Sequence, residues 1–253
     1  MELTHYCDST IVFEYLRLKN VLDSMPRYKV GMHGNLQVIR EYTGTGNKTV
    51  RRITHMNSRN YSEMHQNMLL YNEYAKRKKL FEEEMKRRHI PVSEEFTFKS
   101  DPSVFNAGFW NELVPCANTR EIHTNYYDDY GYHVRSRGEM LIGNALKKLG
   151  LEAKYEPCLI LKGGRKIHPD YSFPVHVIDR CFFIEFMGMS ENEEYLNYNY
   201  GKIDEYMRNG ILPNRDLILI CGTDSWLPTQ EAIMRIIASF INTAVESVYN
   251  RKS

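Results

Sequence analysis

The sequence predicts an α/β fold in which a mixed sheet carries helices on both faces. Two observations lead to this expectation. The C-terminal half of the 253-residue chain alternates apolar, strand-like runs with amphipathic, helix-like segments, in the order α-β-β-β-α-β-α. One of the runs, Asp216–Cys221, is continuously apolar after its first residue, which is typical of a central strand buried on both faces.

Residues 1–95 form an N-terminal appendage of a different kind. Residues 9–24 have apolar side chains at helical spacing and predict a short helix. Leu36–Ile39 and Thr49–Ile53 flank the turn-forming stretch Thr43–Lys48, which indicates a β-hairpin. A long, highly charged helix is expected after the hairpin, over residues 61–89.

Basic residues outnumber acidic ones in the appendage. They lie near the hairpin turn and in two runs of the long helix: Lys48, Arg51, Arg52 and Arg59, then Lys76–Lys79 and Lys86–Arg88. Two interpretations stay open at this point. The helix presents a solvated charged face that Glu82–Glu84 balance, or the appendage is a small DNA-contacting arm.

A turn-rich connecting segment over residues 96–130 leads to a core over residues 131–253. Ser136 and Glu139 form a capping box that opens a helix ending at Gly150. Strands and helices follow at regular intervals. We expect strands at Lys154–Leu161, Lys166–Phe173, Arg180–Met187 and Asp216–Cys221, and helices at 191–209 and 228–249.

Bulk properties exclude several classes of protein. No apolar run approaches the roughly 20 residues that span a bilayer, and the N-terminus lacks a signal-peptide pattern. Five scattered cysteines without a CxxC pair argue against a disulfide scaffold or a structural zinc site, and favour the cytoplasm. Because the net charge is only +1, any basic surface for a nucleic acid has to be local.

Three acidic residues stand at notable points of the core. Glu139 is at the start of its first helix, Asp170 follows Pro169 in the second strand, and Glu185 interrupts an apolar strand. A carboxylate among such apolar neighbours is costly unless it is paired, protonated or bound to a metal. Adjacent strands bring Asp170 and Glu185 together, and oxygen ligands of this kind suit Mg²⁺ or Mn²⁺.

Each acid has a simpler explanation when it is taken alone. Glu139 then serves only the capping box, and Asp170 is a turn or strand-edge acid. Glu185 pairs with a basic residue such as Lys166 or Arg180. The metal site is favoured because all three acids occur together in this order of elements.

The sequence around these acids resembles the PD-(D/E)XK (restriction-endonuclease-like) nuclease superfamily. It is especially similar to a group of uncharacterised bacterial proteins of that superfamily, which share the patterns R-S-x-x-E, P-D-F, I-E-H-x-G-M, K-I-x-x-Y and n-G-I. The resemblance covers about residues 133–222. The matching segments here are Arg135–Glu139, Pro169–Tyr171, Ile184–Met189, Lys202–Tyr206 and Asn209–Ile211.

The resemblance implies a restriction-endonuclease-like core and phosphodiester hydrolysis assisted by Mg²⁺ or Mn²⁺. Asp170 and Glu185 would bind the metal, and Glu139 would complete the site directly or through water. The superfamily usually has a lysine two residues after the second strand acid, where this chain has Met187. Lys202 on the following helix is the expected replacement, with a surface lysine paired to Asp204 or Glu205 as the alternative.

Further residues near the acids are candidates for substrate binding. Arg137, Lys166 and His168 could contact phosphate, and His168 is expected to point to the same face as Asp170 along one strand. Tyr206 shares a helix face with Lys202. For the cluster Tyr195, Tyr198 and Tyr200, packing is expected rather than base stacking.

Taken together, the sequence predicts a cytoplasmic, Mg²⁺-dependent DNA endonuclease, without a membrane partner, whose site is Glu139, Asp170, Glu185 and Lys202. The alternative is a DNA-binding protein with a nuclease fold that is inactive or depends on partners, as an end-cleaving transposase subunit or a junction resolvase does. A homodimer is attractive because double-strand cleavage needs two sites. Sequence preference and the choice between DNA and RNA stay open.

Overall fold

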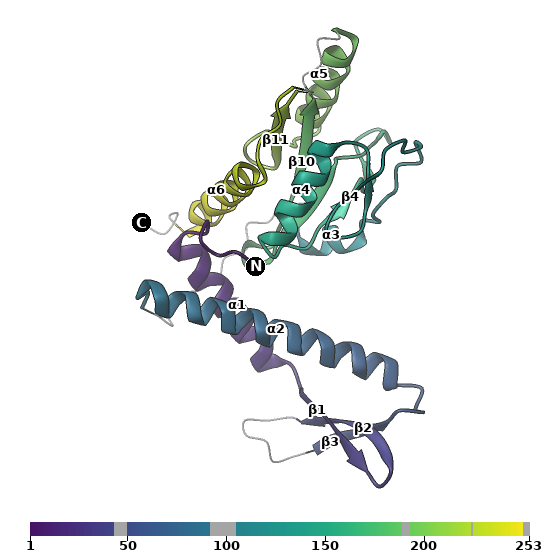
Figure 1. Cartoon of the computed structure of the whole chain (residues 1–253), viewed down its shortest axis with the longest axis vertical. Helices are drawn as coiled ribbons and strands as arrows, with labels where there is room; N and C mark the ends of the chain where they lie inside the picture. Colours follow the sequence, from purple (N-terminus) through teal and green to yellow (C-terminus); the bar gives the residue numbers. More distant parts are fainter. Residues whose placement is uncertain (43–49, 92–104, 189–192, 224, 250–253) are drawn as a thin grey trace. The chain divides into compact units, whose positions relative to one another are not determined.

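The computed structural model describes residues 1–42, 50–91, 105–188, 193–223 and 225–249 (Figure 1). The expected hairpin turn at residues 43–48 lies outside these ranges. Contacts divide the chain into two compact units. Unit 1 contains residues 1–10 and 95–253, and unit 2 contains residues 11–94. The first ten residues therefore group with the C-terminal part, whereas the sequence placed them in the appendage.

Unit 2 contains a three-stranded antiparallel sheet that is covered on one face by a long helix. Its elements are α1 (Asp8–Ser24), β1 (Arg27–His33), β2 (Leu36–Tyr42), β3 (Val50–His55) and α2 (Tyr61–Arg88). The predicted hairpin is confirmed as β2 and β3, and β1 joins it as a third strand. Ile39 packs against Met64 and Met68 of α2, which makes the small core of this unit.

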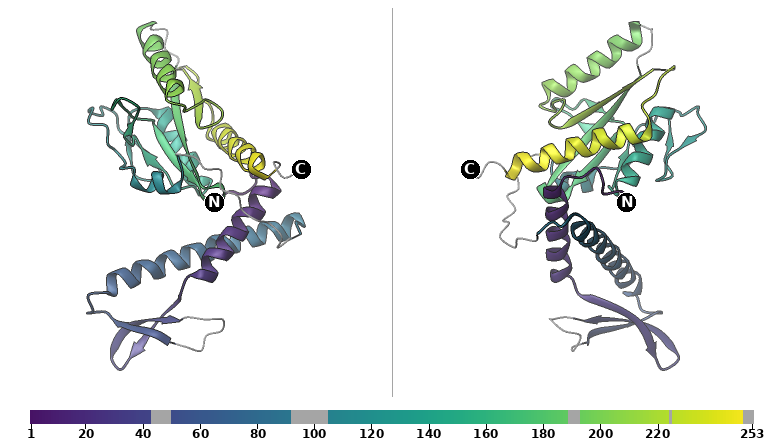
Figure 2. Two further views of the ribbon diagram at one scale, coloured as in Figure 1. Left: turned by 180° about the vertical axis from the view of Figure 1, so that it is seen from behind. Right: turned by 60° about the vertical axis from the view of Figure 1, so that its left-hand side comes forward.

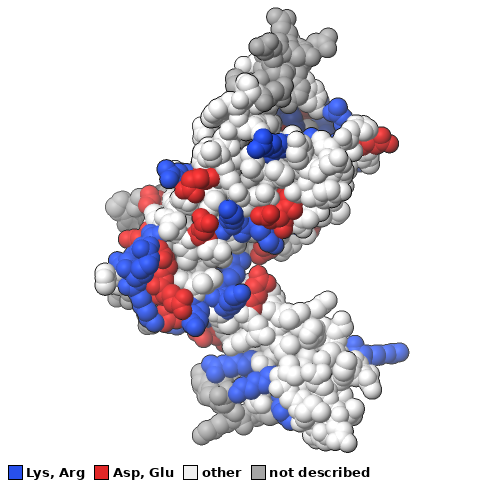
Figure 3. Space-filling model, viewed as in Figure 1, with Lys and Arg blue, Asp and Glu red and all other residues white. Residues whose placement is uncertain are grey.

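The charges of α2 are largely balanced within the helix. Lys86 lies 2.9 Å from Glu82, Arg88 lies 2.7 Å from Glu84, and Arg87 also pairs with Glu84. Figure 3 shows basic and acidic side chains intermixed over the C-terminal part of this helix. The cations in this part of α2 are therefore paired with acids of the same helix.

Unit 1 is built on a mixed four-stranded sheet. The strands are β6 (Lys154–Tyr155), β9 (Tyr171–Val175), β10 (Arg180–Gly188) and β11 (Leu217–Gly222), and their order is β11-β10-β9-β6. β10 runs antiparallel to β9 and parallel to β11. The predicted α/β class with a mixed sheet is confirmed at this level.

The first two predicted strands of the core are each divided in two. The pieces of the first are β6 and β7 (Leu159–Ile160), and those of the second are β8 (Lys166–Ile167) and β9. β7 and β8 pair as a separate hairpin. Pro157 and Pro169 lie in the two breaks, where the missing N–H cannot join a ladder.

The prediction of a central strand at Asp216–Cys221 is wrong for the described residues. β11 lies at the edge of the sheet, and β10 and β9 are the interior strands. The apolar run reflects burial of both faces of β11 rather than a central position. Leu217 packs in one core cluster with Tyr206 of α5 (Glu193–Arg208), while α6 (Gln230–Tyr249) contacts the same strand.

Helices cover both faces of the sheet (Figure 2). α4 (Arg137–Lys148) and α6 contact each other, and Phe240 of α6 meets Phe182 of β10 edge to face at 5.0 Å. On the opposite face, α5 and the short α3 (Ala107–Glu112) pack against Phe183. The remaining short elements are β4 (Tyr126–Tyr127), β5 (His133–Val134) and the 3-10 turn His176–Ile178.

The N-terminal residues are fastened to α4 and α6. The backbone N–H of Glu2 donates to the carbonyl of Lys148 at 2.8 Å, and that of Cys7 donates to Asn242 Oδ1 at 3.1 Å. These bonds explain why the first ten residues belong to unit 1. Within the described ranges, no helix has both the length and the apolar character needed to cross a bilayer.

Candidate active site

One pocket of unit 1, with a volume of about 1110 Å³, is lined by the residues singled out in the sequence. Glu139 comes from α4, Glu185 from β10 and Lys202 from α5, while Asp170 comes from the segment between β8 and β9. The fold therefore collects four separate positions of the chain into one cavity. Lys166 and His168 line the same pocket.

Glu139 is held at the start of α4. Ser136 is the N-cap of the helix, and its hydroxyl accepts from the Glu139 N–H, as the capping box predicts. The reciprocal bond differs from the expectation, because Glu139 Oε2 accepts from the N–H of Arg135 instead of that of Ser136. Tyr155 also donates its hydroxyl to Oε2 at 2.7 Å, so the carboxylate is fixed and buried.

Asp170 lies just before β9 rather than inside a strand. Pro169 cannot donate to a ladder, so the chain turns here between β8 and β9. The Asp170 carboxylate accepts from the N–H of Phe186 at 2.6 Å, which ties it to β10 beside Glu185. His168 lies in the same break, so the expected strand alternation with Asp170 is wrong, although both residues line the pocket.

Glu185 stands on the interior strand β10, and only 3% of it is exposed. The ammonium of Lys202 lies 2.8 Å from its carboxylate, and the hydroxyl of Tyr206 donates to Oε1. The alternative partners are excluded in this structure. Lys166 is exposed, and Arg180 binds Asp216 at 2.6 Å.

Lys202 points into the pocket from α5. Besides Glu185, its ammonium donates to the carbonyl of His168 at 2.8 Å. Asp204 and Glu205 have other partners, Arg208 and Arg165, so the alternative of a surface lysine paired to its helix neighbours is wrong. Lys202 thus carries a positive charge into the place where the acids meet.

Burial dominates the electrostatics of the acids. It raises the pKa of Glu185 to about 8, with help from the charge of Asp170 and against the effect of Lys202. It also raises the pKa of Glu139 to about 7, again with a contribution from Asp170. Burial also raises the pKa of Asp170. For Lys202, burial disfavours the charge, but Glu185 and Asp170 outweigh it and raise its pKa.

The negative charge of the pocket exceeds the positive charge that compensates it. Lys202 serves Glu185, but within the described residues neither Glu139 nor Asp170 has a Lys, Arg or His at ion-pair distance. Buried carboxylates in this situation stay protonated or attract a cation, and an all-oxygen donor set suits Mg²⁺ or Mn²⁺. His168 Nδ1 is buried without a hydrogen-bond partner, which leaves a further polar atom at the pocket to be satisfied.

The three carboxylates are not closed around one point. The described residues include one group of three His, Cys, Asp or Glu side chains whose potential ligand atoms all lie within 4.8 Å, and it consists of Glu2, His5 and Glu231. Glu139, Asp170 and Glu185 do not form such a group. The oxygen donors of these three acids suit a divalent cation. Because the three carboxylates are too far apart, contact of one cation with all of them requires side-chain rotation or a bridging water.

Sequence reasoning missed the pair Arg135 and Glu156. Glu156 is a further buried acid of the pocket, and Arg135 Nε donates to it at 2.8 Å. The guanidinium of Arg135 also donates to the carbonyls of Arg120 and Glu121, and so fixes the segment that forms one wall. Only the position of Glu156 before Pro157 marked it in the sequence, and that signal does not distinguish a buried acid from a turn residue.

Four residues do not take the places expected of them. Arg137 is exposed and does not line the pocket. Tyr206 is fully buried and bound to Glu185, so it positions that acid and presents no surface to a substrate. Tyr198 and Tyr200 are 66% and 65% exposed, which contradicts the expectation that they pack; the side chain of Tyr195 lies outside the described residues.

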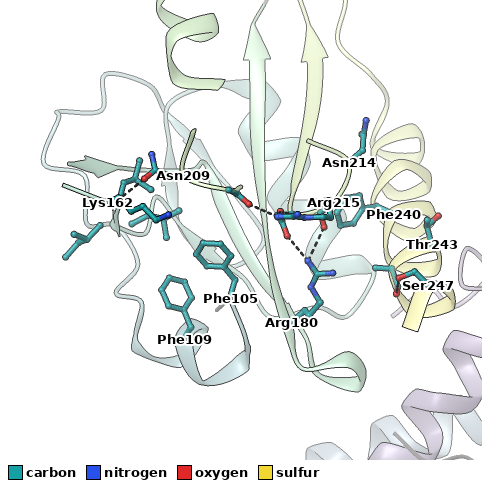
Figure 4. A pocket seen from close by; sticks show the side chains of 16 residues that line it. Phe105, Phe109, Lys162, Arg180, Asn209, Asn214, Arg215, Phe240, Thr243 and Ser247 are labelled. Carbon is teal, nitrogen blue, oxygen red and sulfur yellow. Dashed lines mark hydrogen bonds and ion pairs between the residues drawn. The ribbon is translucent and has the colours of Figure 1, made fainter. Parts of the chain in front are cut away.

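A second pocket, of about 830 Å³, lies at the β11 edge of the sheet and is shown in Figure 4. Its buried acid, Asp216, is already paired with Arg180 and Arg215. Two arginines neutralise one carboxylate there, so this pocket lacks the excess negative charge of the first. The acid-rich pocket is therefore the better candidate for chemistry.

Comparisons with protein-family models, with curated proteins and with solved structures found no match to this chain.

Proposed function

We propose that the chain is a metal-dependent nuclease of the PD-(D/E)XK type, which hydrolyses phosphodiester bonds of DNA. The observation that supports the proposal most is the arrangement around Glu185. Lys202 and Tyr206 bind its carboxylate, while the neighbouring Phe186 N–H binds Asp170. An acid pair with an adjacent lysine fits the needs of this chemistry, because a cation can bind between the acids while the ammonium offsets their charge.

Asp170 and Glu185 are the residues that would hold Mg²⁺ or Mn²⁺, with Glu139 joining directly or through water. A bound divalent cation supplies Lewis-acid chemistry, polarising the scissile phosphate and lowering the pKa of the attacking water. Tyr206 fixes the orientation of Glu185 from inside the core. Lys202 offsets negative charge beside Glu185 and can orient a water at the pocket surface, because its side chain is 21% exposed.

The test is cleavage of plasmid and branched DNA with Mg²⁺, Mn²⁺ or EDTA. Asp170→Asn and Glu185→Gln each remove one charge without changing shape, and both should abolish metal-dependent cleavage. Glu205→Gln is the matched control, because Glu205 lines the same pocket but pairs with Arg165 at 2.7 Å. Undiminished cleavage by Asp170→Asn would show that the assignment is wrong.

A second candidate is a DNA-binding protein that has this site but is inactive or requires a partner. Met187 at the usual lysine position and the open spacing of the three acids favour it. It predicts no cleavage of any substrate by the chain alone, with DNA still bound. It also predicts that Mg²⁺ leaves the melting temperature unchanged if metal binding has been lost. Single-stranded and RNA substrates, and sedimentation for a homodimer, belong in the same set of measurements.

A further inference from the structure

The three-stranded sheet of unit 2 has one face that α2 does not cover. Cross-strand partners share a face, and side chains alternate along a strand. Ile39 packs on α2, so its partner Val30 lies on the covered face, together with Tyr28. The opposite face, called here the open face, therefore contains Arg27 and Lys29.

The register places further groups on the open face. Arg40 is the partner of Lys29, and Tyr42 is the partner of Arg27. Ile53 is paired with Arg40, so β3 continues the same face. The residues whose side chains point to the open face are Arg27, Lys29, Gly31, His33, Leu36, Val38, Arg40, Tyr42, Ile53 and His55. Of these, Val38 in the middle strand is fully buried and adds no exposed surface.

Acidic residues are missing from this face in the described part of the sheet. Glu41 is the one acid in β1, β2 and β3, and its partner is Tyr28, on the covered face. Glu41 is 9% exposed, and its charge contributes, after burial, to raising the pKa of Tyr28. Figure 3 shows Lys and Arg but no Asp or Glu over the described strands in that view. The basic charge of the open face is therefore not balanced locally, in contrast to that of α2.

Two cations of the open face, Arg40 and Lys29, are held in place. The guanidinium of Arg40 lies over Gly31, where a side chain would collide with it, and donates to the Met32 carbonyl at 2.6 Å. Lys29 Nζ lies 5.6 Å from the centre of the Tyr42 ring. His33 and His55 meet edge to face at 5.4 Å. A preordered basic surface loses little side-chain entropy when it binds an extended anion.

We propose that the open face binds the sugar–phosphate backbone of duplex DNA and retains the substrate on the chain. The inference rests on the proposed function, since it names a second contact for the same substrate. Charge complementarity is its physical basis: each phosphate neutralised by Lys or Arg releases condensed counterions. The contact is independent of base sequence, because it is made to phosphates.

The experiment measures binding of the full chain to a fluorescent duplex of about 20 base pairs in EDTA, where no cleavage occurs, over a range of KCl concentrations. Arg27→Ala/Lys29→Ala removes two open-face cations. Lys79→Ala/Lys86→Ala is the matched control, because it removes two exposed cations that α2 pairs with Glu83 and Glu82. Circular dichroism and melting temperature establish that both variants are folded.

The open-face variant should bind about tenfold more weakly, and the slope of log K against log salt should fall by about two. The control should bind almost as the unaltered chain does. Equal losses in both variants would mean that only bulk charge matters, and an unchanged slope in the open-face variant would mean that these cations touch no phosphate; either result overturns the proposal. Because binding is measured without metal, failure here is distinct from a failure of Asp170→Asn to abolish cleavage.

Discussion

The ammonium of Lys202 lies 2.8 Å from the carboxylate of Glu185, although the two residues belong to different elements and are 17 positions apart. α5 brings the lysine to the face of β10 on which the acid points. Lys202 gives the pocket a positive charge from α5, whereas the strand position two residues after Glu185 is occupied by Met187. This arrangement and its surroundings have consequences for cleavage, for pH dependence and for stability.

Replacing Lys202 should separate cleavage from metal binding. Lys202→Met removes the charge and should lower metal-dependent cleavage at least about 100-fold, because a charged group next to the reacting phosphate is lost. Mg²⁺ should still raise the melting temperature, since the acids remain. Arg208→Met is the control on the same helix, where the exposed arginine pairs with Asp204 and does not line the pocket.

A relocated lysine should restore part of the activity. Glu185 and Met187 are two residues apart on β10 and therefore point to the same face. Met187→Lys added to Lys202→Met should recover cleavage above that of Lys202→Met alone. No recovery by a folded double variant would indicate that Lys202 acts through the position of α5 and not through its charge.

Removal of the Tyr206 hydroxyl should shift the pH dependence of the site. The hydroxyl bond to Glu185 lowers the pKa of that acid, so Tyr206→Phe should raise it further and move the pH–rate profile to higher pH. Loss of one buried hydrogen bond to a charged group should also reduce the free energy of unfolding by about 2 kcal/mol. Urea denaturation and rate measurements from about pH 6 to about pH 10 test both effects.

Tyr171→Phe is the matched control for Tyr206→Phe. Tyr171 is also fully buried, and its hydroxyl donates to Asp128 at 2.8 Å. It should lose comparable stability without any shift of the pH–rate profile. An equal shift in both variants would remove the link between Tyr206 and the chemistry.

The metal-free protein should lose stability as the pH rises. Folding raises the pKa of Glu139 to about 7 and that of Glu185 to about 8, both above the value of a free glutamate. The folded state therefore keeps protons that the unfolded chain has lost. The resulting contribution to the free energy of unfolding is complete below about pH 4.5 and is lost as the pH rises through about 7 to 8. Each tenfold difference in acidity between the folded and unfolded states corresponds to about 1.4 kcal/mol.

Melting temperatures in EDTA from about pH 5 to about pH 9 measure this decline. Glu139→Gln and Glu185→Gln should each flatten the curve, because an amide has no proton to lose. Mg²⁺ should reduce the decline in the unaltered chain if it binds the ionised acids. A flat curve in the unaltered chain would contradict the raised pKa values.

Two helical glycines should respond in opposite ways to alanine. A methyl group at Gly138 of α4 would collide with the ring of Phe186, the residue whose N–H binds Asp170. Gly138→Ala should therefore cost about 1–3 kcal/mol and weaken cleavage. Gly201 of α5 has open space at the same point, so Gly201→Ala should stabilise the chain by up to about 1 kcal/mol. Urea denaturation of both variants gives the comparison.

Local patterns in the sequence determined most of the elements and the identity of the buried acids. The Ser136 cap, the apolar run around Glu185 and the helical spacing of residues 191–209 each depend on neighbours within a few positions, and such short-range preferences can be read from the chain. The three acids could be named for the same reason, whereas Lys202 was named through the resemblance to the nuclease superfamily. The two prolines, Pro157 and Pro169, could be seen in the sequence. That they divide the two predicted strands and change the strand pairing could not be predicted from it.

Tertiary structure decided the partners of these residues. That Glu185 binds Lys202 and not Arg180, that Arg135 holds Glu156, and that β11 is an edge strand all depend on contacts between distant segments. The periodicity of apolar residues predicts which side chains are buried, because it shows which face of a helix or strand points to the core. It does not report which group lies opposite, because that depends on how whole elements pack against one another.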